Sequence, residues 1–161
     1  MARMQKGDVG RLVGSIAACE GAGLIGSAFT APAIPTWYAA LEKPAFTPPN
    51  WVFAPVWGAL YALMGIAIFL IWRKGLHEKG VRAAFIIFWV QLVVNILWSG
   101  VFFGLHSILG GAVIIILLWV LVLITMIKFF RLSKVAGGLL VPYQVWLSIA
   151  SALNMWVLIL N

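Results

Sequence analysis

The hydrophobic positions of the chain form five apolar runs with polar stretches between them. The runs cover approximately residues 9–29, 52–72, 83–104, 108–129 and 135–160. A helix needs roughly 20 apolar residues to cross about 30 Å of hydrocarbon, whereas a barrel strand needs about half that number and alternates apolar with polar positions. Residues 112–124 are apolar at every position, which contradicts such alternation. The pattern therefore predicts an all-α integral membrane protein, a bundle of five transmembrane helices in one domain over residues 1–161.

Composition excludes a soluble globular protein. Of the 161 residues, 64% are apolar and 9% are charged, whereas soluble domains have roughly 45–50% and about 25%. Five spans leave no room in a chain of this length for a separate catalytic domain. The single cysteine, Cys19, excludes an internal disulfide.

The distribution of basic residues predicts how the bundle is oriented. Cytoplasmic segments of membrane proteins are enriched in Lys and Arg. Only Lys43 falls on the side that holds the first connection, and the N-terminal segment and the second and fourth connections carry Arg3, Lys6, Arg11, Arg73, Lys74, Lys79, Arg82, Lys128, Arg131 and Lys134. We therefore expect the N-terminus in the cytoplasm and the C-terminus outside. Because these residues flank spans rather than gather on one surface with aromatic partners, they indicate membrane anchoring and no nucleic-acid partner.

The first connection is long, rich in proline and rich in aromatic residues. Six of the seven prolines lie here, at positions 32, 35, 44, 48, 49 and 55, together with Trp37, Tyr38, Phe46, Trp51 and Phe53. Proline restricts the backbone, so such a segment loses little entropy on ordering. Residues 36–43 could form a short interfacial helix capped by Thr36. Two interpretations stay open: a lid that closes the outer end of the bundle, or a belt of aromatic anchors at the membrane surface.

Polar and aromatic residues recur with helical spacing in three spans and fall at similar depth. The faces are Trp57, Tyr61 and Met64 in the second span, Gln91, Asn95, Trp98 and Phe102 in the third, and Tyr143, Trp146, Ala150 and Asn154 in the fifth. Amides that face lipid are costly, so Gln91, Asn95 and Asn154 should point inward. One interpretation is a cavity walled by Trp57, Trp98, Phe102 and Trp146, with Asn95 orienting a flat ligand. The alternative is that the amides hydrogen-bond between helices, each bond contributing about 0.6 kcal/mol, and that the tryptophans fill the core.

The first span has two unusual features. Small residues recur at every fourth position, at Gly10, Gly14, Ala18, Ala22 and Gly26, and such a stripe permits close helix packing, either within the bundle or between two protomers. Glu20 lies nearly opposite the stripe, on the face of Gly23 and Ser27. A carboxyl at this depth is either functional or simply hydrogen-bonded. Its presence also argues against reading the first run as a cleaved signal peptide.

Residues that would support catalysis or metal binding are sparse. The four acidic residues are Asp8, Glu20, Glu42 and Glu78, and no two of them share one face of a span. His77 and His106 fall in connections on opposite sides of the membrane, so no metal or haem ligand set is expected. A binding protein is therefore favoured over an enzyme or a carrier built from inverted repeats.

Three motifs carry a resemblance to a known family. They are TWYAALEKPAFTPPNWVFAPVWGALYALMG, QLVVNILWSGVFFG and VPYQVWLSIASALN, in this order. Together they resemble the TspO/translocator protein family, also called tryptophan-rich sensory proteins or peripheral-type benzodiazepine receptors. The resemblance covers about residues 12–156.

This resemblance implies a five-helix membrane protein, usually a homodimer, with a pocket beneath the first connection. The pocket would bind tetrapyrroles such as protoporphyrin IX, sterols in some members, and synthetic drugs, with no required cofactor. The implied ligand-binding residues are Gly26, Ser27, Trp51, Phe53, Trp57, Asn95, Trp98, Phe103, Trp146, Ala150 and Leu153, to which the face analysis adds Phe102. Trp57 and Trp146 match two tryptophans to which light-dependent porphyrin degradation has been attributed in some bacterial relatives, so they are candidate catalytic residues.

The leading hypothesis is a tetrapyrrole-binding protein of a bacterial or archaeal cytoplasmic membrane, acting in porphyrin handling, transport or stress signalling. The alternatives are a light-dependent porphyrin-degrading enzyme, a sterol- or lipid-binding protein, and a partner scaffold. After Leu153 and Asn154 the chain lacks the tyrosine and arginine of the animal sterol-recognition pattern. Gly110 and Ile114 stand where many relatives have tryptophan and aspartate. We therefore expect weak sterol and drug binding.

Overall fold

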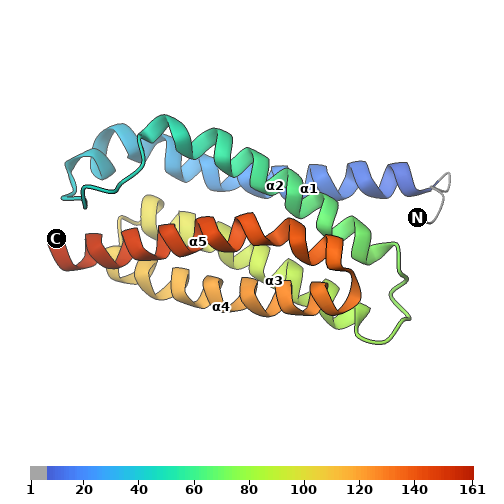
Figure 1. The fold of residues 1–161 in the computed structure, drawn as a ribbon. Helices are drawn as coiled ribbons and strands as arrows, with labels where there is room; N and C mark the ends of the chain where they lie inside the picture. Colours follow the sequence, from blue (N-terminus) through green and yellow to red (C-terminus); the bar gives the residue numbers. More distant parts are fainter. Residues whose placement is uncertain (1–6) are drawn as a thin grey trace.

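The computed structural model describes residues 7–161, and within them every regular element is helical. The elements are α1 (Asp8–Ala33), η1 (Ile34–Tyr38), α2 (Asn50–Trp72), α3 (Val81–Ser99), η2 (Gly100–Gly104), α4 (Ile108–Leu132) and α5 (Lys134–Leu160) (Figure 1). Five helices in this part of the chain are long and apolar enough to cross a membrane. The predicted all-α bundle of five spans is thereby confirmed. Arg3 and Lys6, two of the residues behind the predicted orientation, lie outside the described residues.

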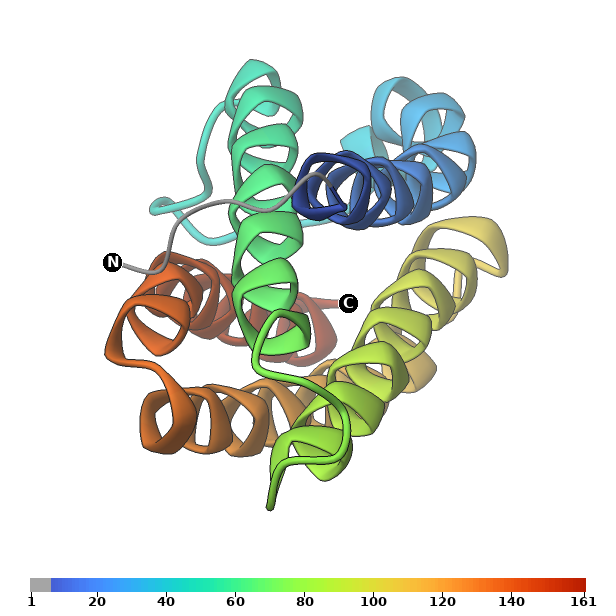
Figure 2. The same ribbon diagram turned by 90° about the vertical axis from the view of Figure 1, so that its right-hand side faces the viewer.

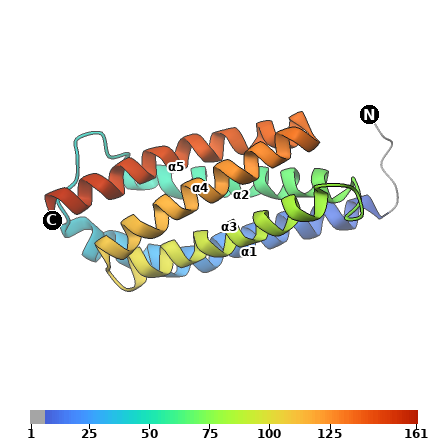
Figure 3. The same cartoon turned by 90° about the horizontal axis from the view of Figure 1, so that it is seen from below.

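The five long helices form a closed ring in the order α1, α2, α5, α4, α3. Seen along the bundle, α1 lies between α2 and α3, and α4 lies between α3 and α5 (Figure 2). The view from below shows the same helices running side by side over most of their length (Figure 3). Each helix therefore packs mainly against two neighbours, with a smaller contact between α2 and α3, and turns its remaining surface outward, where large apolar side chains such as Leu24 and Val113 are exposed. Exposed apolar surface on all sides is what lipid solvates.

Glycines allow the closest approach between α1 and α2. A Cβ atom built on Gly65 would lie 2.5 Å from the Cα of Ile16, so only glycine lets these two backbones touch. The predicted small-residue stripe divides into two parts: Ala22 and Gly26 are buried in the bundle, whereas Gly10 and Gly14, like Ala18, are exposed. Two of the five residues thus pack within the protein, and the other three remain on the surface.

The first helical span is longer than its apolar run suggests. Instead of ending near residue 29, it passes from α1 into the π-helical turn η1 and continues to residue 40. The predicted separate helix over residues 36–43 is therefore wrong, and so is its cap. The Thr36 hydroxyl donates to the carbonyl oxygens of Pro32, at 2.8 Å, and Ala33, at 3.4 Å. Pro35 removes one backbone donor, and a π turn lets the helix run on past it in a different hydrogen-bond register.

The connection that remains, residues 41–49, is hydrogen-bonded to the end of the first span and to the end of α5. The Lys43 ammonium donates to the carbonyl oxygens of Tyr38, at 2.7 Å, and Leu41, at 2.8 Å, which satisfies acceptors at the end of the first span. The Asn161 amide both accepts from the Glu42 backbone N–H and donates to the Glu42 carbonyl, each at 3.0 Å. The connection is therefore tied to the end of α5.

A candidate ligand-binding cavity

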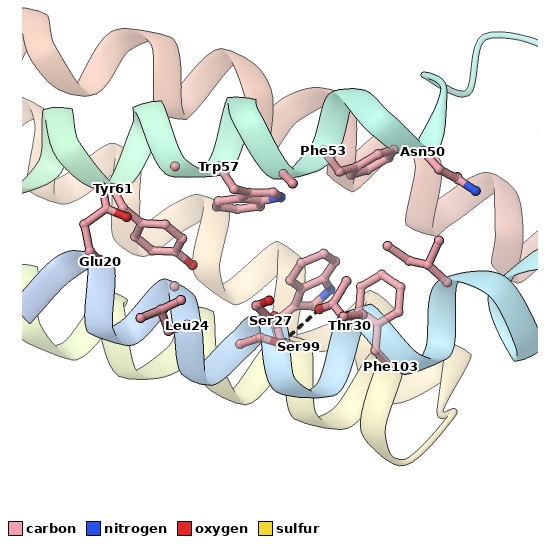
Figure 4. A pocket seen from close by; sticks show the side chains of 17 residues that line it. Glu20, Leu24, Ser27, Thr30, Asn50, Phe53, Trp57, Tyr61, Ser99 and Phe103 are labelled. Atoms are coloured by element: carbon pink, nitrogen blue, oxygen red, sulfur yellow. Dashed lines mark hydrogen bonds between the residues drawn. The ribbon is translucent and has the colours of Figure 1, made fainter.

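A cavity of about 330 Å³ lies between α1, α2 and α3 (Figure 4). Its lining is mostly apolar and aromatic, with a few hydroxyl groups and one carboxyl group. The lining residues are Glu20, Gly23, Leu24, Gly26, Ser27, Thr30, Ala31 and Ile34 from the first span, Asn50, Phe53, Ala54, Trp57, Gly58 and Tyr61 from α2, and Trp98, Ser99 and Phe103 from the third span. No residue of α4 or α5 belongs to this lining.

The cavity is open on the side between α1 and α2. Leu24, which lines it, is 72% exposed, and Ala31 on α1 and Ala54 on α2 are exposed lining residues as well. The residues from the third span, by contrast, are buried and form the back wall. Because both flanking helices are membrane spans, the opening faces the hydrocarbon of the bilayer.

Trp57 is the central residue of the aromatic wall. Its ring stacks on Tyr61 with centroids 5.6 Å apart and lies 6.3 Å from the ring of Trp98. Behind it, Tyr143 of α5 meets the same ring edge-on at 6.1 Å. The spacing of Phe53, Trp57 and Tyr61, four residues apart, places all three on one face of α2. The wall therefore presents aromatic rings along much of the length of the cavity.

Small residues and hydroxyl groups form the opposite wall on α1. A Cβ atom at Gly26 would lie 3.1 Å from the Ser99 hydroxyl oxygen, so glycine leaves room for α3 to approach here. The Thr30 hydroxyl donates to the Gly26 carbonyl at 3.0 Å. At the inner end, Glu20 extends from α1 toward α2 beside Tyr61 (Figure 4).

A chain of buried hydrogen bonds lies behind the cavity, between α2, α3 and α5. The Tyr61 hydroxyl donates to Asn95 Oδ1 at 2.6 Å, and Asn95 Nδ2 donates to the Tyr143 hydroxyl at 2.8 Å. That hydroxyl in turn donates to Gln91 Oε1 at 3.1 Å. The network joins α2, α3 and α5, and Asn95 uses both ends of its amide in it. Asn95 therefore positions Tyr61 rather than lining the cavity itself.

The third predicted amide, Asn154, also points inward. Its Oδ1 accepts from the Trp98 indole N–H at 3.4 Å, and its Nδ2 donates to the carbonyl of Ala150 at 3.0 Å. Gln91, Asn95 and Asn154 are 1%, 1% and 4% exposed, so the prediction that all three face inward is confirmed. Asn154 fixes the indole of Trp98 against α5.

The end of the bundle that holds the first connection is closed by aromatic rings from the two π turns. In η2, Phe102 and Phe103 are both buried, with ring centroids 4.8 Å apart. From η1, Trp37 meets Phe102 edge-on at 5.3 Å and Tyr38 meets Phe103 at 5.6 Å. Neighbouring positions of an α-helix point about 100° apart, and the wider π turn lets both phenylalanines turn inward.

His106 extends this aromatic cluster. It follows η2 with a positive φ of 54° and stacks on Trp37 with ring centroids 4.6 Å apart. A positive φ is uncommon outside glycine, and the stack holds it in place. The aromatic cluster at this end of the bundle therefore comes from the two π turns and the residue that follows η2 closely.

The structure brings half of the expected ligand-binding residues to this cavity. Those that line it are Gly26, Ser27, Phe53, Trp57, Trp98 and Phe103, and those that do not are Trp51, Asn95, Phe102, Trp146, Ala150 and Leu153. Trp51 is 76% exposed, while Ala150 and Leu153 are buried in α5. Trp146 packs edge-on behind Phe53 at 5.7 Å, and its buried indole N–H has no acceptor among residues 7–161. Of the four rings predicted to wall one cavity, Trp57 and Trp98 line this one, whereas Phe102 and Trp146 pack behind its walls, and their contact with a ligand stays a prediction.

Sequence reasoning missed most of the α1 wall. Glu20, Gly23, Ser27, Thr30 and Ile34 follow one another at steps of three or four residues and so share one helix face. The sequence predicts a common face for Glu20, Gly23 and Ser27, but of the five residues only Ser27 belongs to the predicted ligand-binding set. The signal was weak because glycine, serine and threonine on a transmembrane helix indicate helix packing as readily as a cavity. Among the described residues, no group of three or more His, Cys, Asp and Glu side chains could hold a metal ion.

Comparison with known proteins identifies the family. The TspO/MBR family matches residues 15–160. The chain belongs to the TspO/MBR family. It is 46% identical over 152 residues to the tryptophan-rich protein TspO of Archaeoglobus fulgidus, covering 94% of this chain and 97% of that protein. It is 42% identical over 146 residues to the tryptophan-rich protein TspO of Chlorobaculum tepidum, covering 91% and 92%.

A more distant relative belongs to the same family. The human translocator protein is 37% identical over 120 residues, covering 73% of this chain and 70% of that protein. The resemblance recognised from the three motifs is therefore confirmed. The family and the five apolar helices together make this TspO/MBR protein an integral, multi-pass membrane protein.

Proposed function

We propose that this protein binds a porphyrin, or another flat apolar ligand, between α1 and α2, and that it acts in porphyrin handling, transport or stress signalling. The observation that carries the proposal is the aromatic-walled cavity formed by Phe53, Trp57, Trp98 and Phe103. A flat conjugated ring gains most from aromatic faces with which it can stack or make edge contacts. The porphyrin is the ligand here, and no resident cofactor or metal is invoked.

The size and opening of the cavity suit a flat ligand that enters with one edge first. Its volume of about 330 Å³ is at the lower end of the roughly 300–1,000 Å³ typical of small-molecule sites. A whole protoporphyrin is larger, so the part that does not fit extends through the opening between α1 and α2. The exposed side chains of Leu24 and Ala54 at this opening are apolar, as required for contact with the outer part of the ring.

The position of the opening favours entry from the lipid phase. Porphyrins and other flat apolar molecules partition into bilayers, where the opening between two spans is accessible. We place the protein in a bacterial or archaeal cytoplasmic membrane with its N-terminus inside, in keeping with the basic residues that flank the spans. We also propose a homodimer that forms through the three exposed residues of the stripe, Gly10, Gly14 and Ala18.

A titration in the dark tests the proposed site. Protoporphyrin IX is added to purified protein while tryptophan quenching and the Soret shift are followed. We expect saturable binding at micromolar concentration or below, and Trp57→Ala should raise Kd by at least about tenfold, which corresponds to about 1.4 kcal/mol. The effect is expected because this substitution removes the ring that stacks on Tyr61 and lies against Trp98.

The matched control for this titration is Trp156→Ala. Trp156 is 46% exposed on α5 and does not line the cavity, so its loss should leave Kd within about twofold. Equal losses in the two variants would refute the assignment of the site. The absence of saturable binding in the wild-type protein would refute the proposed ligand class.

A further inference from the structure

Glu20 stands alone among the acidic residues because it lies at the middle of a membrane span. It is 12 residues from the first residue of α1, Asp8, and 13 from the last, Ala33, which is about 18–20 Å from either end at 1.5 Å per residue. It is half-buried and forms the inner end of the cavity between α1 and α2. A carboxyl group at this depth is a functional candidate by default, because lipid cannot solvate its charge.

No other residue in the described part of the chain satisfies this carboxyl group. Within residues 7–161, Glu20 makes neither a hydrogen bond nor an ion pair, and the lining of the cavity includes no Lys, Arg or His. Asp8 shows the contrast: it is buried near the end of α1 and pairs with Arg73 at 3.2 Å. Glu20 therefore faces the cavity without a counter-ion.

The Tyr61 hydroxyl, which belongs to a ring beside Glu20 in the lining, is engaged in another hydrogen bond. Tyr61 donates its hydroxyl to Asn95 at 2.6 Å. Its ring lies against Gly23, where a Cβ atom would come within 2.5 Å of it, one helical turn from Glu20. Trp57 stacks with the same ring at a centroid distance of 5.6 Å. The lining of the cavity thus combines one carboxyl group with two electron-rich aromatic rings.

We propose that the inner end of the cavity is a subsite for a protonated amine, with Glu20 as its counter-ion and the rings of Tyr61 and Trp57 as its apolar contacts. Carboxylates pair with ammonium groups, and aromatic faces attract cations more strongly when water is excluded. The inference rests on the proposed ligand-binding role of the cavity and narrows the ligand class. A preferred ligand is flat and apolar and carries a cationic group on one edge.

The same arrangement sets the orientation of ligands that carry acidic groups. A carboxylate placed next to Glu20 would meet a like charge in a poorly solvated site, which is unfavourable. The acidic edge of protoporphyrin IX therefore points away from Glu20, toward the opposite end of the cavity, where Asn50 offers a side-chain amide.

Three probes with one aromatic core test the charge preference. Pyrenemethylammonium, pyrenemethanol and pyrenecarboxylate are titrated into purified full-length protein in an uncharged detergent, and binding is read by energy transfer from tryptophan to pyrene. In the wild-type protein we expect the ammonium probe to bind at least about tenfold more tightly than the alcohol, and the carboxylate to bind most weakly. Competition with protoporphyrin IX shows that the probes occupy the cavity.

Three variants assign the preference to one side chain. Glu20→Gln keeps the size of the side chain and should abolish the difference between the ammonium probe and the alcohol while leaving affinity for the alcohol unchanged. Glu20→Asp retains a carboxylate and should retain a preference for the ammonium. Glu42→Gln removes a charge in the exposed connection outside the cavity and should change nothing.

The outcomes separate this inference from the proposed function. Equal affinity of the wild-type protein for the ammonium probe and the alcohol, or a preference that survives in Glu20→Gln, overturns the subsite and leaves porphyrin binding intact. Failure of all three probes and of protoporphyrin IX to bind overturns both proposals. Loss of the preference in Glu20→Gln alone, with protoporphyrin still competing, supports the subsite.

Discussion

Asn95 connects three helices through a single side-chain amide. It accepts a hydrogen bond from Tyr61 of α2 and donates one to Tyr143 of α5, and it is itself 1% exposed. A buried polar group that loses its partner costs about 1–3 kcal/mol, because nothing else in its surroundings can replace the bond. The residue thus contributes to the cavity by fixing the position of Tyr61.

The first prediction concerns this amide. Asn95→Leu should lower the free energy of unfolding by about 1–3 kcal/mol, since it leaves the Tyr61 hydroxyl without an acceptor. The double variant Tyr61→Phe, Asn95→Leu should be less destabilised than the sum of the two single variants, because the first substitution removes the orphaned hydroxyl. Denaturation of the protein in mild detergent, followed by circular dichroism, measures both effects. Strict additivity would show that this hydrogen bond contributes nothing.

For single residues, the sequence predicts whether a polar side chain faces the interior better than it predicts the groups to which that side chain hydrogen-bonds. That Gln91, Asn95 and Asn154 face inward follows from the cost of exposing an amide to lipid. That Asn95 bonds to Tyr61 and Tyr143, and not to a ligand, depends on how three helices are rotated relative to one another. Helical spacing within one span carries no information about that rotation, so Asn95 was expected in the cavity and was found beneath it.

Between whole helices, the close contact of α1 with α2 depends on glycines. A Cβ atom on Gly65 would press into the backbone of Ile16, and one on Gly23 into the ring of Tyr61. Backbone atoms cannot move aside as the end of a flexible side chain can, so the two helices would have to separate. The cavity lies along this same pair of helices, and its width is coupled to their distance.

The second prediction tests whether the distance between α1 and α2 determines the width of the cavity. Gly65→Ala should destabilise the protein by about 1–3 kcal/mol through overpacking, and it should weaken protoporphyrin binding as well. Gly14→Ala is the control, because a Cβ atom there meets nothing within 4 Å; alanine, the better helix former, should leave stability unchanged or raise it by up to about 1 kcal/mol. Thermal unfolding and the dark titration measure the two effects, and equal stability of both variants would contradict the close approach.

The helices themselves were largely predictable. The last four apolar runs end within about three residues of the observed spans, since the thickness of the bilayer sets their length. The first run was ended too early because its prolines indicate a break, whereas the π turn η1 carries the helix onward to residue 40. Helical spacing alone predicts only Phe102 on the inward face of its span, and Phe103 entered the predicted site through the family resemblance. A π turn changes which face a residue occupies and has no simple signature in the sequence.

At the scale of the whole molecule, the order of the helices in the ring decides which residues meet. The cavity lies where α1, α2 and α3 adjoin, and α5 lies on the other side of α2. Trp146 therefore packs against the lining residue Phe53, whereas the ring of Trp57 lines the cavity directly. Apolar faces toward lipid and toward the interior look alike in a sequence, so this order could not be predicted from hydropathy.

The third prediction concerns assembly. Gly14 is exposed on α1, remote from the cavity lining, and belongs to the exposed part of the small-residue stripe. Gly14→Leu should shift the detergent-solubilised protein from dimer to monomer while leaving protoporphyrin affinity within about twofold. Sedimentation measures the first quantity and the dark titration the second. A dimer that persists in this variant would exclude the stripe as the interface.

The central claim is the location of the ligand, and a structure of the protein with protoporphyrin IX bound tests it most directly. The account predicts the ring system between α1 and α2, in contact with Trp57, Trp98 and Ser27, with its acidic edge away from Glu20. A ring system enclosed instead by Trp146, Ala150 and Leu153, without contact to the α1 wall, would contradict it.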